Sequence, residues 1–213
     1  MRGFTSNRGL AAGVTALDVD VLAVQEIERH VIRSWFADQP ALVERAMGGT
    51  SRGYAPARSL ALTGSDGVAL CSRAPITQHE VISLPHEEGQ PRVALRAEIE
   101  GITIVTTHLQ NEEHEARRQL AWLLDLLGTH GGPCVLLGDL NLRPTDIDGM
   151  VADAGFVSAG GGFTNPADAP IQQIDHILVR GREVEPAIVG DAPVSDHRPL
   201  ITTLTNSGPL STP

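Results

Sequence analysis

The chain has 213 residues, 41% of them hydrophobic and 3% aromatic, and it carries a formal net charge of −10 at pH 7. This length and composition suit one globular domain, which we expect to span residues 1–205. Its sizeable core should consist of Val, Leu, Ile and Ala. The acidic charge argues against broad, salt-sensitive attraction to nucleic acid or anionic lipid. It is compatible with a small basic site, or with acids that recruit a divalent cation.

Sequence features also bear on where the protein works. No stretch approaches the length of a membrane span, and the first seven residues carry no apolar signal segment. We therefore expect a cytoplasmic protein, although an incomplete N-terminus would hide a signal, and a disordered tail over residues 206–213. Cys71 and Cys134 both lie in apolar runs, which predicts two buried thiols rather than a disulfide.

Four segments have the apolar spacing of helices. In chain order they are Leu10–Leu17, Pro40–Met47, Glu112–Leu127 and Asp146–Ala154. Ser6 or Asn7 can cap the first of them. The third is the clearest, because its leucines at positions 120, 123, 124 and 127 fall on one face and its charged residues lie elsewhere.

Short apolar or alternating runs predict the strands. In chain order these are Val21–Val24, Val68–Cys71, Ile76–Leu84, Arg92–Ile99, Ile102–Thr107, Cys134–Leu137, Ile174–Val179, Val184–Val189 and Leu200–Leu204. Hairpins alternate with strand–helix–strand steps along the chain. This mixture predicts an α/β protein with mixed sheets rather than a purely parallel one.

Four short segments place a carboxylate at the end of an apolar run or beside one. They are Gln25–Glu26, Gly138–Asn141, Ile174–His176 and Ser195–His197. Acids beside buried strands need partners, because an unpaired charge is costly to bury. Their occurrence in four places indicates one site, and its composition favours metal-assisted phosphoester chemistry.

The first two segments offer oxygen and amide groups. Glu26 follows a Val-rich strand, where it could bind a hard cation, although alone it would be a surface acid. Gly138 lets the chain bend, and the spacing of Asp139 and Asn141 puts them on one side of an extended segment. Such a pair joins a group that can orient or deprotonate water to an amide that can donate to a phosphoryl oxygen. The competing interpretation is an Asx-turn after a strand.

The last two segments suggest an acid–imidazole pair. Neighbouring side chains on a strand point apart, so Asp196 and His197 would serve different groups: the metal or its water, and the phosphate. Asp175 is the candidate that orients the His197 ring and raises its basicity. A structural Asp–His pair that closes a loop is the alternative.

His108 ends a strand and could donate to a phosphoryl oxygen or protonate a leaving group, provided that other site residues lie beside it. The remaining histidines are interpreted as surface or structural residues. No His spacing matches a zinc signature, and an oxygen-rich site favours Mg²⁺ or Mn²⁺ over Zn²⁺.

Taken together, these segments resemble the endonuclease/exonuclease/phosphatase superfamily of metal-dependent phosphoesterases, over roughly Leu10 to Leu204. The resemblance implies a four-layer α/β sandwich of two packed mixed sheets flanked by helices. It implies that Glu26 binds the divalent metal with assistance from Asp196. It also implies that Asp139 orients or activates the attacking water, and that Asn141 helps to hold the nucleophile and the phosphate.

For the imidazoles, the resemblance implies that His197, paired with Asp175, and His108 bind and stabilise the phosphoryl oxygens. One feature departs from the family. Its members open with a strand carrying an Asn that joins the Glu at the metal, whereas Leu10 onward already matches the first helix. The sequence therefore predicts a sandwich that lacks the family's first strand.

The function expected from these residues is hydrolysis of a phosphodiester or phosphomonoester by metal-assisted in-line attack of water. Nucleic acid and a small or lipid phosphoester are about equally favoured as substrates, and no protein partner is evident. The alternative is a non-catalytic scaffold of the same superfamily, with an impaired metal site and a binding role. The intact acidic segments argue against that alternative.

Overall fold

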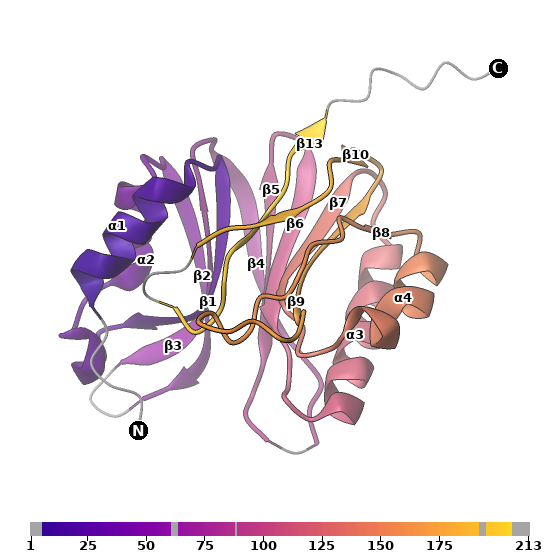
Figure 1. The fold of residues 1–213 in the computed structure, drawn as a ribbon, viewed down its shortest axis with the longest axis horizontal. Helices are drawn as coiled ribbons and strands as arrows, with labels where there is room; N and C mark the ends of the chain where they lie inside the picture. The colour runs from indigo at the N-terminus through magenta and orange to yellow at the C-terminus, as the bar shows by residue number, and fades with distance from the viewer. Residues whose placement is uncertain (1–5, 61–63, 88, 192–194, 206–213) are drawn as a thin grey trace.

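Two β-sheets pack face to face at the centre of the molecule, and a pair of helices covers the outer face of each (Figure 1). The computed structural model describes residues 6–60, 64–87, 89–191 and 195–205. The outer layers are α1 (Asn7–Leu17) with α2 (Gln39–Ala46) on one side and α3 (Glu113–Gly128) with α4 (Pro144–Asp153) on the other. The four-layer α/β sandwich expected from the sequence is confirmed.

The two sheets differ in size and in strand direction. The smaller has the order β1 (Val21–Arg29), β3 (Ser65–Ser72), β2 (Ser51–Ser59) and is antiparallel throughout. The larger has the order β4 (Ile76–Ser83), β5 (Val93–Ile99), β6 (Ile102–His108), β7 (Cys134–Asp139), β9 (Asp175–Arg180), β8 (Val157–Ser158). Only β6 and β7 pair in parallel, so the larger sheet is mixed as expected. The smaller sheet was also expected to be mixed, and that part of the prediction is wrong because both of its strand pairs are antiparallel.

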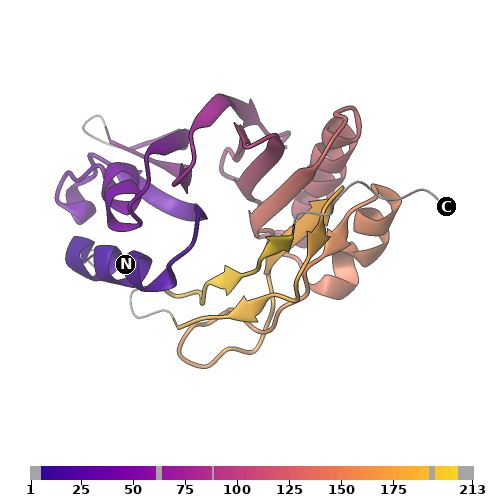
Figure 2. The same ribbon diagram turned by 90° about the horizontal axis from the view of Figure 1, so that it is seen from above.

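The last strands form two short antiparallel ladders, where the sequence predicts two longer strands over Val184–Val189 and Leu200–Leu204. The pairs are β10 (Glu183–Val184) with β13 (Leu204–Thr205) and β11 (Ile188–Val189) with β12 (Leu200–Ile201). Pro186 lies between β10 and β11 and has no N–H to offer, which interrupts the pairing. Figure 2 shows these yellow strands along the side of the molecule, between the indigo α1 and the orange end of the larger sheet.

Each space between two layers holds its own hydrophobic core. Val14, Val43 and Cys71 belong to the core beneath α1 and α2. A second core fills the space between the sheets, and a third lies beneath α3 and α4. The four leucines that the sequence places on one face of α3 are all buried in this third core, so the predicted orientation of that helix is confirmed.

The strand β2 is absent from the expectations drawn from the sequence. It contains Gly53 and Pro56 and has no apolar run. Such a strand is tolerated here because β2 is the edge of its sheet, where a proline need not donate to a neighbour. The register of β2 on β3 shifts between Pro56 and Arg58, next to the proline.

The two cysteines lie in different cores, Cys71 beneath α1 and α2 and Cys134 beneath α3 and α4. Both are buried and free, as the sequence predicts. In the described part of the chain, no helix combines the length and the apolar character needed to span a bilayer. The tail expected over residues 206–213 lies outside the described residues.

Candidate active site

Three neighbouring strands of the larger sheet bring one predicted site residue each to the same rung. His108 of β6 is in register with Asp139 of β7, and Asp139 is in register with Asp175 of β9. Register partners on adjacent strands have their side chains on the same face of the sheet. Three residues far apart in the sequence therefore meet at one edge.

Gly138 determines how closely β7 approaches β6 just before the site. Its φ of +142° is unfavourable for other residues, and a Cβ placed there would lie 2.1 Å from the backbone oxygen of Thr107. The glycine lets β6 and β7 stay paired up to His108 and Asp139. The position of the Asp139 carboxylate therefore depends on residue 138 having no side chain.

We expect Gly138→Ala to lower the free energy of unfolding by about 2–4 kcal/mol, because the Cβ meets backbone and the φ is strained. Urea unfolding measures the change. Gly149→Ala is the matched control, since this residue lies in α4 with nothing within 4 Å of its Cβ position. The control should be neutral or slightly stabilising, and equal loss in both variants would contradict the prediction.

Asp139 and Asn141 come together through a turn rather than an extended segment. The backbone N–H of Asn141 donates to Asp139 Oδ1 at 3.0 Å, and Asn141 has a left-handed φ of 52°. This is the Asx-turn considered from the sequence, and the two-residue alternation assumed there is wrong because β7 ends at Asp139. The Asn141 amide donates to the backbone oxygen of Leu109 at 3.1 Å, which fixes the side chain.

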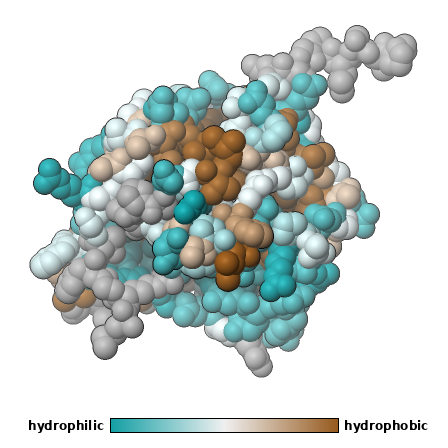
Figure 3. Space-filling model, in the orientation of Figure 1, coloured by the Kyte–Doolittle hydropathy of each residue, from teal (hydrophilic) through white to brown (hydrophobic). Residues whose placement is uncertain are grey.

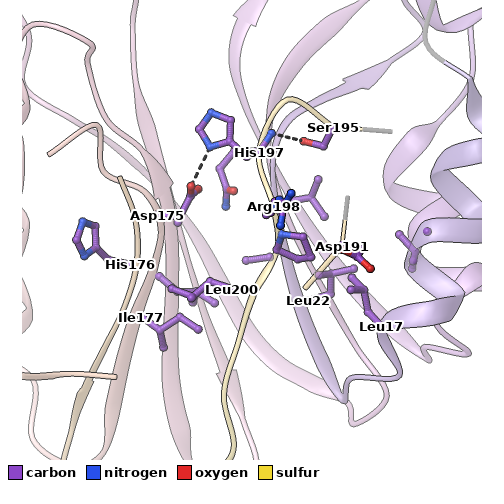
Figure 4. Close-up of a pocket in the computed structure, with 18 of the residues that line it drawn as sticks. Leu17, Leu22, Asp175, His176, Ile177, Asp191, Ser195, His197, Arg198 and Leu200 are labelled. Atoms are coloured by element: carbon purple, nitrogen blue, oxygen red, sulfur yellow. Dashed lines mark hydrogen bonds and ion pairs between the residues drawn. The ribbon is translucent and has the colours of Figure 1, made fainter. Parts of the chain in front are cut away.

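His197 is held by Asp175. Its Nδ1 lies 2.8 Å from Asp175 Oδ2, and because an ionised carboxylate can only accept, Nδ1 carries the hydrogen (Figure 4). The other ring nitrogen, Nε2, lies 3.9 Å from Asp139 Oδ2. His108 Nε2 lies 3.4 Å from the same oxygen, so two imidazoles flank one carboxylate oxygen.

His176 follows Asp175 and lies apart from this group. It is buried, and its Nε2 donates to the backbone oxygen of Leu142 at 2.8 Å. Burial lowers the pKa of its ring, which keeps it neutral. This agrees with the structural role expected from the sequence.

Glu26 reaches the site from the smaller sheet. It lies in an irregularity of β1 between Val24 and Ile27, where its φ is 53°. The neighbouring Gln25 donates from Nε2 to Thr106 Oγ1 at 3.0 Å and so links β1 to β6 across the two sheets. This bulge turns an exposed carboxylate toward the larger sheet, which a regular strand would not do.

All seven residues singled out from the sequence line one cleft of about 300 Å³. They are Glu26, His108, Asp139, Asn141, Asp175, Asp196 and His197. Asp196 is exposed and lies in the loop before β12, not on a strand. Three amides that the sequence analysis did not select line the same cleft: Asn111, Asn165 and Gln172. They lie outside the helices and longer strands, and Asn165 and Gln172 form an isolated bridge, so no periodic pattern marks them.

Burial and charge perturb the two central groups. Burial raises the pKa of Asp139 from its usual 3.8 to about 6, and the charge of Asp175 acts in the same direction. For His197, burial lowers the pKa, but the hydrogen bond and charge of Asp175 outweigh it, and the net pKa is raised. His197 is therefore held closer to its cationic form, which suits contact with an anion.

We expect Asp139→Asn to be more stable than the wild type above pH 6 when a chelator keeps the protein free of metal. A pKa raised to about 6 means that the native state holds this proton more tightly than the unfolded chain does. Ionisation above pH 6 therefore costs the native state about 3 kcal/mol. Measured by urea unfolding, the free energy of unfolding of the variant should exceed that of the wild type at pH 8, and the difference should vanish near pH 4. An equal difference at both pH values would contradict this.

The donor set fits a divalent cation. Ligand atoms of Asp139, Asp175 and His197 lie within 4.8 Å of one another, and Glu26 and Asp196 add two carboxylates to the same cleft. Oxygen-rich sites of this kind suit Mg²⁺ or Mn²⁺. Asp175 Oδ2 already accepts from His197, so the other oxygens that the cleft offers to a cation include Asp175 Oδ1 and the carboxylates of Glu26 and Asp196.

The sequence matches the model of the Endonuclease/Exonuclease/phosphatase family over residues 2–197. The chain belongs to the endonuclease/exonuclease/phosphatase family. No curated protein matches the sequence. Enzymes of the endonuclease/exonuclease/phosphatase family hydrolyse phosphoester bonds and generally use a divalent metal, which agrees with the acids and imidazoles gathered in the cleft.

Solved structures show the same fold. A conserved protein of unknown function from Enterococcus faecalis V583 shares 18% identity over 94% of this chain and 91% of its own, with a TM-score of 0.76. An endonuclease/exonuclease/phosphatase family protein from Leptotrichia buccalis C-1013-b shares 17% over 94% and 92%, with a TM-score of 0.71. Truncated Caenorhabditis elegans TDP2 shares 17% over 93% and 92%, with a TM-score of 0.65.

Proposed function

We propose that the protein is a divalent-metal-dependent phosphoesterase that hydrolyses a phosphodiester or phosphomonoester by in-line attack of water. The observation that carries the proposal is the convergence on Asp139 Oδ2. The Nε2 atoms of His108 and His197 lie 3.4 and 3.9 Å from this oxygen, inside a cleft rich in acids and amides. A general base between two imidazoles is an arrangement suited to attack on phosphorus.

Asp139 is proposed to orient the attacking water and accept its proton. Its Oδ1 is occupied by the N–H of Asn141, which leaves Oδ2 for the water. A carboxylate with a pKa near 6 takes up a proton more readily at neutral pH than an ordinary aspartate does. Burial and the charge of Asp175 thus make this group a better base.

The imidazoles are proposed to bind the phosphoryl oxygens. Asp175 fixes the hydrogen of His197 on Nδ1 and favours the protonated ring, so that Nε2–H can donate to a phosphoryl oxygen. His108 is the second donor, on the other side of Asp139 Oδ2. The amide of Asn141, which lines the same cleft, is proposed to help hold the nucleophile and the phosphate.

Glu26 and Asp196 are proposed to hold the cation, Mg²⁺ or Mn²⁺. When bound, the cation supplies Lewis-acid polarisation of the phosphoryl oxygens. Both carboxylates are exposed at the cleft, so they can stay ionised without the cost of burying a charge, and this supports the assignment.

Metal titration distinguishes the proposed ligands from the acid that orients His197. We expect Glu26→Gln to weaken Mg²⁺ or Mn²⁺ binding by at least about tenfold, because one carboxylate ligand is lost. Asp175→Asn should change the affinity less, since Asp175 acts on the His197 ring. Isothermal titration calorimetry gives both values without any substrate.

Glu100→Gln is the matched control for this titration. Glu100 is exposed in the turn between β5 and β6 and should not alter metal affinity. If Asp175→Asn weakened binding more than Glu26→Gln did, the metal would lie among Asp139, Asp175 and His197, and the proposed ligand assignment would be wrong.

Nucleic acid and a small or lipid phosphoester both fit this chemistry as substrates. A hydrolysis panel of plasmid DNA, single-stranded oligonucleotide, bis-p-nitrophenyl phosphate, inositol phosphates and sphingomyelin, each with Mg²⁺, Mn²⁺ or chelator, separates them. The non-catalytic scaffold predicts no metal binding at millimolar concentrations and no hydrolysis of any substrate in the panel.

A further inference from the structure

Large apolar side chains that face the solvent gather in two loops beside the cleft. Among the described residues, nine large hydrophobic residues are exposed, and five of them belong to these loops. Ile32, Trp35 and Phe36 lie between β1 and α2, and Phe163 and Ile171 lie between β8 and β9. These five residues are 52–72% exposed. Single exposed hydrophobic residues are ordinary, whereas a group of them marks an interaction surface.

The loop between β1 and α2 holds its aromatic residues in a fixed arrangement. Trp35 and Phe36 have φ values of 57° and 56°, a left-handed conformation that bulky residues rarely adopt. Backbone hydrogen bonds keep them there. The N–H of Trp35 donates to the oxygen of Ile32 at 3.0 Å, and the N–H of Phe36 donates to the oxygen of Val31 at 2.9 Å. The exposed apolar surface therefore belongs to an ordered loop.

Both loops border the cleft, one from each sheet. In the first loop, Arg33 Nη2 lies 3.8 Å from Asp66 Oδ2, and Asp66 lines a small hollow together with Glu26 of the cleft. The second loop carries Asn165 and Gln172, which line the cleft itself. Figure 3 keeps the orientation of Figure 1 and shows brown apolar side chains near the middle of this face, where Figure 1 draws the orange loop before β9.

The charges around these loops are balanced in place. The arginines beside the first loop each pair with a carboxylate, in the ion pairs Arg29–Asp38, Arg33–Glu28 and Arg58–Asp66. Beside the second loop, Arg198 donates to the backbone oxygen of Ala167 at 2.7 Å. A nucleic acid or an anionic bilayer binds through cations that are available to its phosphates, and the net charge of −10 opposes both. Apolar side chains among balanced charges fit a zwitterionic phospholipid surface.

We propose that the two loops dock on the surface of a zwitterionic phospholipid bilayer, with Trp35, Phe36 and Phe163 in its interfacial region. Because the cleft is bordered by both loops, docking through both places the cleft against the lipid headgroups. The docking itself needs no hydrolysis. The substrate class that this orientation selects, a phosphoester of a lipid headgroup, rests on the proposed function.

The two tryptophans of the chain report the docking directly. In Trp122→Phe, Trp35 is the remaining tryptophan. Its emission should shift to shorter wavelength with phosphatidylcholine vesicles and should be quenched by brominated phosphatidylcholine. In Trp35→Phe, the reporter is Trp122 of α3, whose emission should do neither. A shift of Trp122 in place of Trp35 would show that another face binds the vesicles and would overturn the proposal.

Substitutions in the two loops test each of them separately. Trp35→Asn combined with Phe36→Asn suits the backbone, because asparagine accepts the left-handed conformation of both positions. This variant should keep its Tm, and co-sedimentation with phosphatidylcholine vesicles should show a partition coefficient at least about tenfold lower, because two interfacial aromatic side chains are lost. Phe163→Ser combined with Ile171→Ser should lower it at least about threefold. Trp122→Gln, which removes an exposed aromatic residue from α3, is the control and should not change it.

The loops need no metal and no net charge, so partition should be equal with Mg²⁺ or chelator and should change less than about twofold with salt. An absence of partition, full partition by the double Asn variant, or a requirement for anionic lipid would overturn the proposal. So would a shift of Trp35 emission caused by single-stranded oligonucleotide alone or by dimerisation of the chain. Unchanged partition of the Phe163 and Ile171 variant would overturn the orientation of the cleft.

The outcomes for docking and for catalysis are separable. Partition without hydrolysis of any phosphoester would contradict the proposed function and leave the docking intact. Hydrolysis of a soluble phosphoester without partition would contradict the docking alone.

Discussion

Asp139→Asn is expected to lower kcat about 10²–10⁴-fold on whichever phosphoester the protein hydrolyses, because the proposed general base is lost. The replacement is isosteric, and its oxygen can still accept from the Asn141 N–H, so the turn after β7 should persist. Steady-state kinetics with Mg²⁺ measures the loss. KM should change less than kcat, since the base acts on the attacking water and not on substrate binding.

The same variant should be more stable than the wild type at pH 8 in the absence of metal, so a loss of activity could not be attributed to unfolding. Asp148→Asn is the control, because Asp148 is an exposed acid of α4 away from the cleft. Near-normal hydrolysis by purified Asp139→Asn would show that another group activates the water.

His197→Ala is expected to lower kcat by a comparable factor of about 10²–10⁴, because the substrate loses a donor whose pKa Asp175 holds above its ordinary value. The space left by the ring offers a further test. Added imidazole should restore part of the activity in the alanine variant, as expected when an imidazole group itself does the chemistry.

Asp175→Asn should give a smaller loss than His197→Ala, because the ring remains but its Nδ1 no longer faces a charge. His79→Ala serves as the control for a histidine on an exposed strand position of β4. A full loss in His197→Ala without any response to imidazole would point to a structural role, in which the Asp175–His197 pair only closes a loop.

Much of the fold follows from local pattern. The leucine stripe of α3 predicts both the helix and its buried face, and the apolar runs predict the central strands of the larger sheet. His108 and Asp139 end their strands and Asp175 begins one, and these segments were recognisable because polar or acidic side chains beside buried strands need partners. What the sequence could not reveal is the register that aligns these three residues on one rung, since register depends on contacts between distant strands.

Other features could not be predicted from the sequence, for different physical reasons. The strand β2 contains a proline and has no apolar run, so its sequence does not resemble a strand. It is tolerated because it lies at the edge of its sheet. Asn141 reaches the cleft through a left-handed turn that two-residue alternation does not describe. The position of Glu26 in the cleft depends on a bulge in β1. The positions of Asn111 and Gln172 depend on the course of the chain outside the regular elements. Neither feature leaves a periodic pattern in the sequence.

Glu26 is carried by one sheet, while His108, Asp139 and Asp175 are carried by the other, and the bond from Gln25 to Thr106 ties the two together. The proposed mechanism therefore draws its groups from both sheets. Neither sheet carries all of the proposed groups, so the spacing between the sheets would set the geometry of the proposed reaction as much as any single side chain does.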